Sequence, residues 1–165
     1  MAHPGLQDPH FARSVVLVLA HDEEEGSMGL VLNRPGPLSG PENEVLAPWL
    51  DSSCEPRTVF VGGPVQVDGF VCLVEDATEP SRVRSVDFMS DEPLVGRNHR
   101  MFRGYAGWSP GQLRDEISEG GWIVVESSSG DAFTTDPRTL WHDVLARQEG
   151  PVASLAKVPE DPALN

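Results

Sequence analysis

The fold is decided by the stretch SVVLVLAHDEEEGSMGLVL, residues 14–32. Residues 14–20 are apolar on both faces and rich in β-branched side chains, a pattern typical of a buried central strand. Residues 21–27 are polar and indicate a solvated loop, and residues 28–32 are apolar again. Two apolar runs joined by a short polar loop predict an antiparallel hairpin, and Pro35 ends its second strand.

Outside this hairpin the sequence is rich in turn-forming residues. The 165 residues include 16 Gly and 15 Pro, well above average usage, which favours many short elements and a strand-rich fold over a helical bundle. Hydrophobic residues make up 39% and charged residues 23%, so we expect most of the chain to fold. At this length we expect one domain of mixed α and β structure over residues 1–150, followed by a loosely held tail over residues 151–165.

Apolar runs and helical periodicity place the other elements. Further strands are predicted at residues 58–61, 70–74, 83–88, 101–105 and 122–125. Helices are predicted at residues 45–50 in spite of Pro48, at residues 109–117 with Ser109 as the cap, and from about residue 136 to residue 145. Residues 36–43 are expected as a surface linker and residues 62–69 as a loop.

The acidic charge balance limits the partners of the chain. Twelve Lys and Arg residues face 26 Asp and Glu residues, which gives a formal net charge of −14. Nucleic-acid binding depends on clustered cations, and the densest group is only Arg97, Arg100 and Arg103, so no nucleic-acid partner is expected. No stretch reaches membrane-spanning length, and no basic start precedes a long apolar segment. We therefore expect a cytoplasmic protein without a membrane partner.

Motifs for metals and cofactors are missing from the sequence. Cys54 and Cys72 lie outside metal-type spacing, and Cys72 in its apolar run is interpreted as a small buried thiol, although spacing alone leaves a disulfide open. His21 beside Asp22–Glu25 could attract a hard cation, but a charged hairpin loop explains these residues better. The glycine-rich signatures of nucleotide sites are absent as well. We expect no metal and no cofactor.

The sharpest enzymatic motif is Gly107-Trp108-Ser109-Pro110-Gly111, a literal G-x-S-x-G between a predicted strand and a predicted helix. It makes Ser109 a candidate nucleophile of a serine-type hydrolase. The residue after such a serine normally supplies an oxyanion-hole N–H, and Pro110 has none, which removes roughly 3 kcal/mol of transition-state stabilisation. His99 and His142 are the available bases, yet each is more simply a solvated side chain. A helix cap is the preferred interpretation of Ser109, and catalysis is not expected.

Polar and aromatic residues at the predicted strand ends favour a binding pocket. Arg34 can bind a carboxylate or a phosphate through two parallel hydrogen bonds, although an internal acid would fit it equally well. Two adjacent glycines could cradle a phosphate, but a tight turn needs the same backbone freedom. Tyr105 and Trp108 could offer a stacking surface for a ligand, although aromatic rings more commonly pack in a core. The candidate ligand-binding residues are Asn33, Arg34, Gly62, Gly63, Tyr105 and Trp108.

Several of these segments fit the pattern of one family. The chain resembles the YqgE/AlgH family in its signature segments, which are Leu32-Asn33-Arg34-Pro35, Gly62-Gly63-Pro64-Val65, and Gly104-Tyr105-Ala106-Gly107-Trp108 followed by Gly111-Gln112-Leu113. Their order and spacing fit too. The likeness begins at residues 2–6 and 8–11 and runs to Gln148, so it covers nearly the whole chain.

The resemblance implies a bacterial cytosolic α+β domain with a large, mostly antiparallel sheet, barrel-like in form, and a few flanking helices. It implies no established activity, and the family's label of transcriptional regulator comes from an association with alginate production. Relatives usually carry a short apolar strand before the segment that matches residues 2–6, so either the start is truncated or an edge strand is missing. The position of Ser109 is commonly not serine in relatives, whereas a nucleophile could not vary.

These observations leave several functional hypotheses. The leading one is a non-catalytic protein that binds a small anionic ligand in one pocket formed by the candidate residues, or a regulatory or interaction protein with a protein partner. One alternative is a serine-type hydrolase that uses Ser109. Another is a protein-binding module that contacts its partner through exposed Trp49, Trp108 or Trp141. A transcriptional regulator, as the family label suggests, is disfavoured by the charge.

Overall fold

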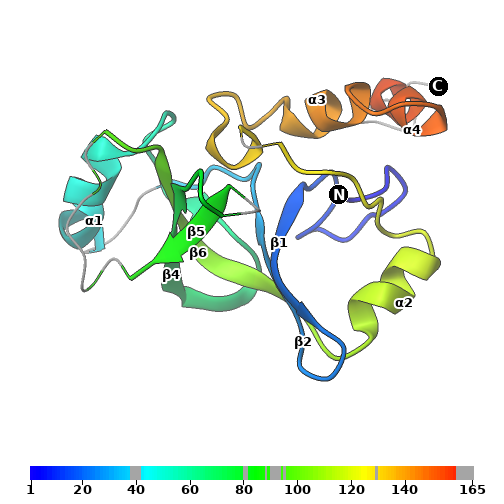
Figure 1. Cartoon of the computed structure of the whole chain (residues 1–165), viewed down its shortest axis with the longest axis horizontal. Helices are drawn as coiled ribbons and strands as arrows, with labels where there is room; N and C mark the ends of the chain where they lie inside the picture. Colours follow the sequence, from blue (N-terminus) through cyan, green and yellow to red (C-terminus); the bar gives the residue numbers. More distant parts are fainter. Residues whose placement is uncertain are drawn as a thin grey trace.

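The structure is a computed structural model that describes residues 1–37, 42–79, 82–87, 89, 94, 96–128 and 130–158. It is an α+β fold in which helices surround one curled sheet (Figure 1). The strands are β1 (Val16–Asp22), β2 (Gly26–Val31), β3 (Phe60–Val61), β4 (Val65–Glu75), β5 (Val83–Val86) and β6 (His99–Trp108). The helices are α1 (Glu42–Ser52), α2 (Gln112–Ser118), α3 (Leu140–Ala146) and α4 (Pro151–Ser154), with 3-10 turns at η1 (Asp131–Phe133) and η2 (Leu155–Lys157).

The six-stranded sheet has the order β1-β2-β6-β4-β5, and β3 pairs with β6 beside this path. All pairs are antiparallel except β3 with β6. The sheet curls into a half-barrel because β6 belongs to both of its halves, pairing with β2 near its end and with β4 along its first part. Gly104, with a φ of 66°, lies two residues before the part of β6 that pairs with β2. The prediction of a mostly antiparallel α+β fold is confirmed.

The predicted hairpin is formed by β1 and β2. Its register pairs Val16 with Val31 and Asp22 with Gly26, and an irregularity falls between Val18 and Ala20. Because β1 stands at the end of the strand order, β2 is its only strand partner among the described residues. The apolar strand predicted to be central is therefore an edge strand, and one side of its backbone is open.

Three of the sequence predictions need correction. Residues 122–125 run extended, but in the part of the chain that the structure describes only Trp122 forms a bridge, to Ala2, and no strand pairs with the segment. Most of the predicted loop at residues 62–69 belongs to β4, which begins at Val65 and pairs irregularly until Phe70. The strand predicted at residues 101–105 is longer than expected, since β6 runs from His99 to Trp108.

The predicted helices are present, with one difference at a cap. Helix α2 begins at Gln112 behind Gly111, whose φ of 75° supplies the left-handed residue. The Ser109 side chain does not cap this helix, and instead the Ser109 N–H donates to Gln112 Oε1 at 3.0 Å. Helix α1 contains Pro48, as expected. Part of the predicted tail forms α4 and η2, which pack against α3, and residues 159–165 lie outside the described residues. So do residues 38–41 of the predicted linker.

The core consists of three clusters, and β6 contributes to each of them. Phe102 belongs to the largest, below α3, together with Trp141. Met101 points to the second, where Trp49 of α1 packs. Trp108 at the end of β6 belongs to the third, beside α2. The alternation of neighbouring β6 side chains between clusters shows why this strand has to be buried on both faces.

Candidate binding groove

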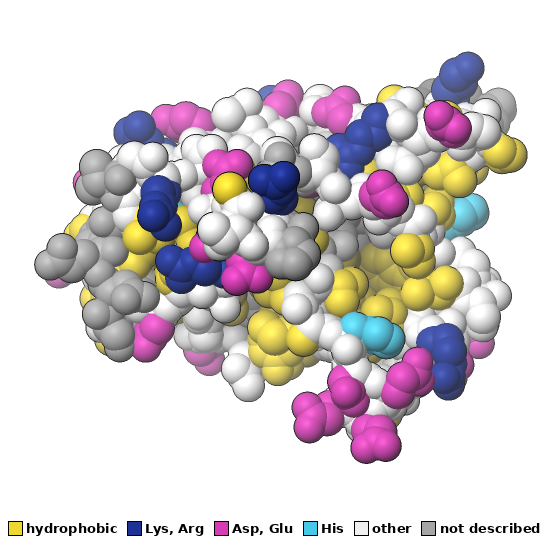
Figure 2. Space-filling model, viewed as in Figure 1, with side chains coloured by type: hydrophobic (Ala, Val, Ile, Leu, Met, Phe, Trp, Pro, Cys, Tyr) yellow, Lys and Arg dark blue, Asp and Glu magenta, His cyan; other side chains and the backbone are white. Residues whose placement is uncertain are grey.

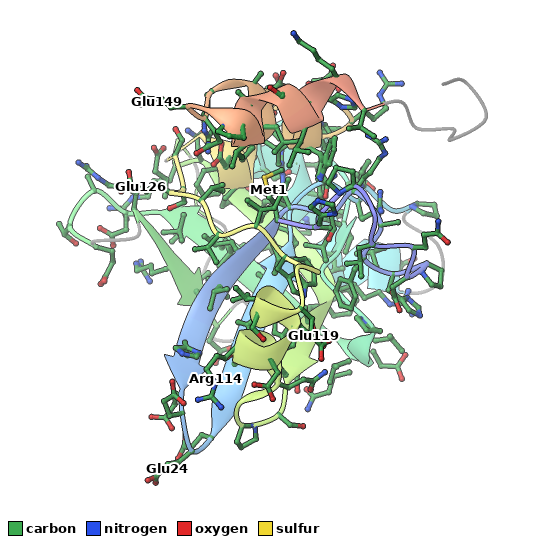
Figure 3. All side chains as sticks on the ribbon, turned by 90° about the vertical axis from the view of Figure 1, so that its right-hand side faces the viewer. Met1, Glu24, Arg114, Glu119, Glu126 and Glu149 are labelled. Carbon is green, nitrogen blue, oxygen red and sulfur yellow. The ribbon has the colours of Figure 1, made fainter. Side chains whose placement is uncertain are left out.

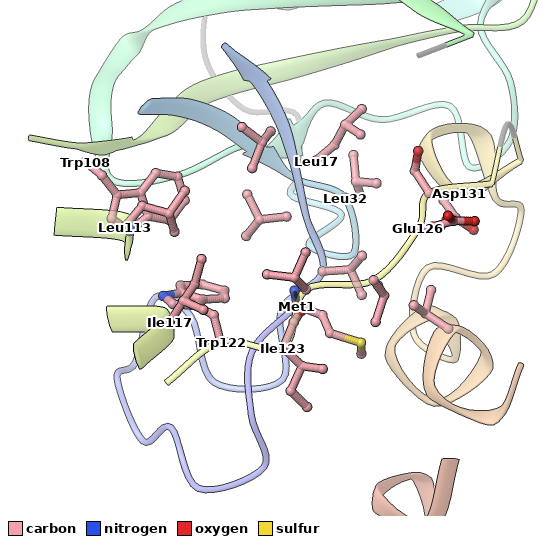
Figure 4. A pocket seen from close by; sticks show the side chains of 17 residues that line it. Met1, Leu17, Leu32, Trp108, Leu113, Ile117, Trp122, Ile123, Glu126 and Asp131 are labelled. Carbon is pink, nitrogen blue, oxygen red and sulfur yellow. Dashed lines mark hydrogen bonds between the residues drawn. The ribbon is translucent and has the colours of Figure 1, made fainter. Parts of the chain in front are cut away.

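An apolar groove runs between the open edge of β1 and the extended segment at residues 122–127. It encloses a cavity of about 270 Å³, near the lower end of the range for small-molecule sites. Figure 4 shows the groove from close by. Its lining comes from the N-terminus, β1, α2 and the extended segment, and includes Met1, Val16, Leu17, Val18, Leu113, Ile117, Ile123 and Val124.

Two core clusters form the two sides of this groove. On one side, Trp108, Leu113 and Ile117 belong to the cluster beside α2. On the other side, Leu17 and Leu32 belong to the large cluster below α3. Figure 4 shows these two groups facing each other across the cavity. The groove is therefore a gap in the packing between two clusters, and it is lined by apolar side chains above and below.

The open edge of β1 forms one wall of the groove. The Leu32 N–H donates to the Val15 carbonyl at 2.8 Å, so Val15 faces β2. Backbone groups in an antiparallel ladder alternate between the two sides of a strand. Val16 and Val18 therefore direct their N–H and C=O groups away from β2, toward the groove.

The extended segment forms the opposite wall. The Met1 amine donates to the Ile123 carbonyl at 2.8 Å, and the Ile123 N–H donates to the Met1 carbonyl at 2.8 Å. Val125 lies two residues further on and faces the same side. Within the described part of the chain, nothing pairs with the backbone of Val125. The groove continues beyond this pair along residues 124–127.

Few polar groups reach this groove. Burial lowers the pKa of the Met1 amine from 8.0 to about 6, because the charged form is desolvated. Asp131 is nearly buried and accepts from Arg147 Nη1 at 2.6 Å, so its charge is neutralised locally. Glu126 lies exposed at the same end of the groove. Apart from the Met1 amine, the ionisable groups that line the groove, Glu126 and Asp131, lie together at one end of it (Figure 4).

The groove is open to solvent. Val124 is 74% exposed and Val18 is 44% exposed, although both are apolar and both line the cavity. Figure 2 shows hydrophobic side chains gathered in a hollow between the hairpin and the C-terminal helices. Exposed apolar patches of this kind mark binding surfaces in soluble proteins.

Asn33 and Arg34, predicted to bind a ligand, lie away from this groove. Asn33 is buried and links two segments, since its Oδ1 accepts from the Val15 N–H at 3.0 Å and its Nδ2 donates to the Arg13 carbonyl at 2.8 Å. Arg34 is half-buried and donates to the Ala12 carbonyl. Partial burial lowers the pKa of the Arg34 guanidinium. No acidic side chain of the described residues forms an ion pair with it.

The glycine pair serves a close crossing of two backbones. A Cβ at Gly62 would lie 2.3 Å from the Gly104 carbonyl oxygen, and a Cβ at Gly63 would lie 2.2 Å from the Tyr105 carbonyl group. The Gly62 N–H also donates to the Arg103 carbonyl at 2.8 Å. These contacts give both glycines a role in packing, because the crossing leaves no space for a Cβ.

The two aromatic candidates separate in space and role. Tyr105 is half-buried and lines two shallow clefts on the outer side of β6. Trp108 is buried and donates to Glu116 Oε2 at 2.9 Å. Trp108 lines the apolar groove, while neither Arg34 nor the glycine pair does. Of the six candidates, the structure therefore brings only Trp108 to this site.

Comparison with known proteins assigns the chain to a family. The profile described as AlgH-like matches residues 1–153. The chain belongs to the AlgH-like family. A UPF0301 protein of Streptomyces coelicolor is 44% identical to this AlgH-like chain over 182 residues, and the match covers 100% of this chain and 92% of that protein. A UPF0301 protein of Thermobifida fusca is 42% identical over 185 residues, and the match also covers 100% of this chain and 92% of that protein.

Two solved structures support the same fold for the AlgH-like chain. A crystal structure of a Corynebacterium diphtheriae protein matches with a TM-score of 0.82 at 27% identity, covering 96% of this chain and 89% of the other. The solution structure of the AlgH protein from Pseudomonas aeruginosa matches with a TM-score of 0.69 at 26% identity, covering 96% and 91%. The expected YqgE/AlgH resemblance is confirmed.

The serine motif of the AlgH-like chain shows no hydrogen-bonded catalytic pair among the described residues. Ser109 is exposed, and no imidazole of the described residues is hydrogen-bonded to it. His99 is fully buried between the carbonyls of Trp49 and Arg97, so its interpretation as a solvated residue was wrong. His142 is half-buried against the Trp141 ring. The hydrolase alternative is not favoured.

Further predictions for the AlgH-like chain can be compared directly with the structure. Trp49, Trp108 and Trp141 are all buried, with Trp141 Nε1 donating to the Ala2 carbonyl at 2.9 Å, so a contact surface built on exposed tryptophans was wrong. Cys54 and Cys72 are free, and Cys72 is buried. The described residues contain no metal-type cluster of three His, Cys, Asp or Glu side chains. None of their helices is long and apolar enough to cross a membrane.

Sequence reasoning missed most of the groove. A helix was predicted at residues 109–117 and a strand at residues 122–125, but the gap between them was not predicted. The available signal was an apolar segment at residues 122–125 with no strand assigned to pair with it.

Proposed function

We propose that this AlgH-like chain is a non-catalytic interaction protein that binds an apolar ligand in the groove between β1 and residues 122–127. The observation that supports it is the uncovered gap between two core clusters, with Val18 and Val124 exposed at its mouth. Burial of apolar surface contributes about 25 cal/mol per Å². An apolar occupant therefore gains affinity here without needing a charged partner.

A neutral fluorescent dye such as Nile red tests this function. We expect its emission to rise on binding the wild type, and its affinity to fall about tenfold in the double variant Val18→Asp, Val124→Asp, because carboxylates would have to be desolvated in the groove. The matched control is Val45→Asp, Val67→Asp, which changes two exposed valines elsewhere. Equal losses in both variants, or none in the first, would contradict the proposal.

A second candidate function is anion binding near Arg34, as the sequence predicts. The observation that favours it is that the half-buried guanidinium meets a carbonyl and no acidic side chain among the described residues. We expect inorganic phosphate to raise the melting temperature of the wild type and not of Arg34→Ala. The control is Arg57→Ala, which removes an exposed arginine paired with Glu55. A phosphate shift that survives Arg34→Ala would remove this candidate.

The remaining expectations concern location and partners. A cytoplasmic location and the absence of a nucleic-acid partner stay predictions from composition, supported by the net charge of −14. A regulatory role in transcription would then act through a protein partner. An interaction groove is compatible with that route.

A further inference from the structure

We infer that the cleft beside the β1–β2 hairpin binds a small organic cation, with its ammonium group at the hairpin and its apolar body against Tyr105. This site is separate from the one in the proposed function, and it takes another class of ligand. The cleft has a volume of about 620 Å³, within the range of small-molecule sites. Among the residues that line it, only Trp108 also lines the apolar groove.

Three parts of the sheet form this cleft. The hairpin supplies its charged end, and β6 and the start of β4 supply its apolar part. The lining includes Asp22, Glu25, Met28, Val65 and Tyr105. A smaller cleft of about 260 Å³ adjoins it, since Met28 and Tyr105 line both, and Phe70 lines the smaller one. The two clefts together offer an acidic end at the hairpin and a mostly apolar end on the side of Phe70.

The hairpin end of the cleft carries two carboxylates with free acceptor atoms. The N–H groups of Glu25 and Glu24 donate to Asp22 Oδ1 at 2.9 and 2.7 Å and lower the pKa of the Asp22 carboxyl, which is therefore ionised. Neither Asp22 Oδ2 nor the Glu25 carboxylate accepts a hydrogen bond from the described residues. Figure 2 shows acidic side chains gathered at the tip of the hairpin. A bound ammonium group would donate charge-assisted hydrogen bonds to these oxygens.

The basic side chains around the cleft do not neutralise this charge. Arg114, which Figure 3 shows near the hairpin tip, already pairs with Glu23 at 3.0 Å. Arg103 of β6 lies 3.7 Å from Asp68, and neither arginine lines either cleft. The His21 ring lines the larger cleft and is hydrogen-bonded within the hairpin at 2.8 Å. The lining therefore favours cations over anions and attracts them most strongly at the hairpin end.

Tyr105 and its apolar neighbours fit the body of the ligand. A Cβ at Gly107 would lie 3.3 Å from Tyr105 Cε2, so the ring lies beside the bare backbone of Gly107. Met28 and Val65 line the same cleft. Aromatic rings attract ammonium groups and also pack against apolar groups. A compact inorganic cation would leave this apolar surface uncovered, whereas an organic cation covers it and meets the carboxylates at once.

NMR of the full chain labelled at tyrosine tests this inference, because Tyr105 is its only tyrosine and reports the cleft directly. Three ligands share a phenyl body and differ in charge: phenylethylammonium, phenylethanol and phenylpropionate. Titration at about pH 8, where the amine stays charged, gives each Kd from the Tyr105 ring resonances. We expect the cation to bind about tenfold more tightly than the alcohol, and the anion to bind more weakly than the alcohol.

A matched pair of charge changes locates the ammonium group. Glu25→Gln removes the charge of a side chain that lines the cleft, and Glu24→Gln makes the same change at the same hairpin tip outside the lining. Both side chains are exposed, so neither change should alter the fold. We expect Glu25→Gln to weaken the cation about fivefold and to leave the Kd of phenylethanol unchanged, while Glu24→Gln weakens the cation by less than about twofold.

Several results would overturn this inference, and none of them bears on the proposed function. If the cation binds no more tightly than phenylethanol, apolar contact alone accounts for its binding. If Glu24→Gln weakens it as much as Glu25→Gln, the net charge of the chain is responsible. Tyr105 resonances that stay unchanged up to about 10 mM cation would also refute the site. Displacement of Nile red by the cation would place the cation in the apolar groove instead, whereas we expect Nile red binding to be unaffected.

Discussion

At the scale of single residues, Glu116 holds the aromatic wall of the groove. Its Oε2 accepts from Trp108 Nε1 at 2.9 Å and from Trp122 Nε1 at 2.7 Å, and its Oε1 accepts from Gln112 at 2.8 Å. Phe11 packs against both indoles. One carboxylate of α2 therefore ties the end of β6 to the start of the extended segment.

We predict that Glu116→Ala destabilises the chain by roughly 2–4 kcal/mol, because two indole N–H groups lose their acceptor inside a packed cluster. The same variant should weaken Nile red binding, since Trp108 and Trp122 line the groove. Glu116→Gln keeps an acceptor oxygen and should lose less than half as much. Urea unfolding and dye titration measure both effects. A Glu116→Ala chain as stable as the wild type would show that the two hydrogen bonds do not hold this wall.

At the scale of elements, the curl of the sheet depends on the bend within β6. Gly104 has a φ of 66°, and a Cβ there would lie 2.5 Å from the Gly63 carbonyl oxygen. Both the backbone conformation and the space therefore require glycine. This bend lets one strand pair with β2 at its end and with β4 along its first part.

We predict that Gly104→Ala lowers the free energy of unfolding by roughly 2–4 kcal/mol, since the strain and the overlap add. The control is Gly130→Ala, because Gly130 has a φ of −80° and open space around it. We expect the control to change stability by less than about 0.5 kcal/mol. Chemical denaturation compares the two, and equal effects would contradict the role given to the bend.

The elements also show which features can be predicted from sequence. The β1–β2 hairpin and helix α3 follow from local apolar patterns, and both were predicted. Residues 122–125 have the same apolar character, but a strand needs a partner, and pairing is not encoded in the segment alone. The packing roles of Gly62 and Gly63 depend on contacts with the backbone of β6, about 40 positions away in the chain. From the sequence alone, a close crossing of two backbones could therefore not be distinguished from a tight turn or a phosphate site.

At the scale of the whole molecule, an apolar groove lies between β1 and residues 122–127 in the part of the chain that the structure describes, on a protein of net charge −14. Of the residues predicted to bind an anion, Gly62 and Gly63 have packing roles, and Arg34 does not line the groove. The overall architecture was predictable from the family resemblance, whereas the groove arises only when β1, α2 and residues 122–127 meet. The central claim is that this groove binds an apolar ligand.

NMR chemical-shift perturbation with Nile red added to the full chain tests that claim most directly. Val16, Val18 and Val125 line the groove. We predict that the amide resonances of these three residues shift on dye binding, because the ligand occupies the groove beside them. Unchanged resonances of these three residues in the presence of saturating dye, or shifts confined to the region of Arg34 and Tyr105, would contradict the account.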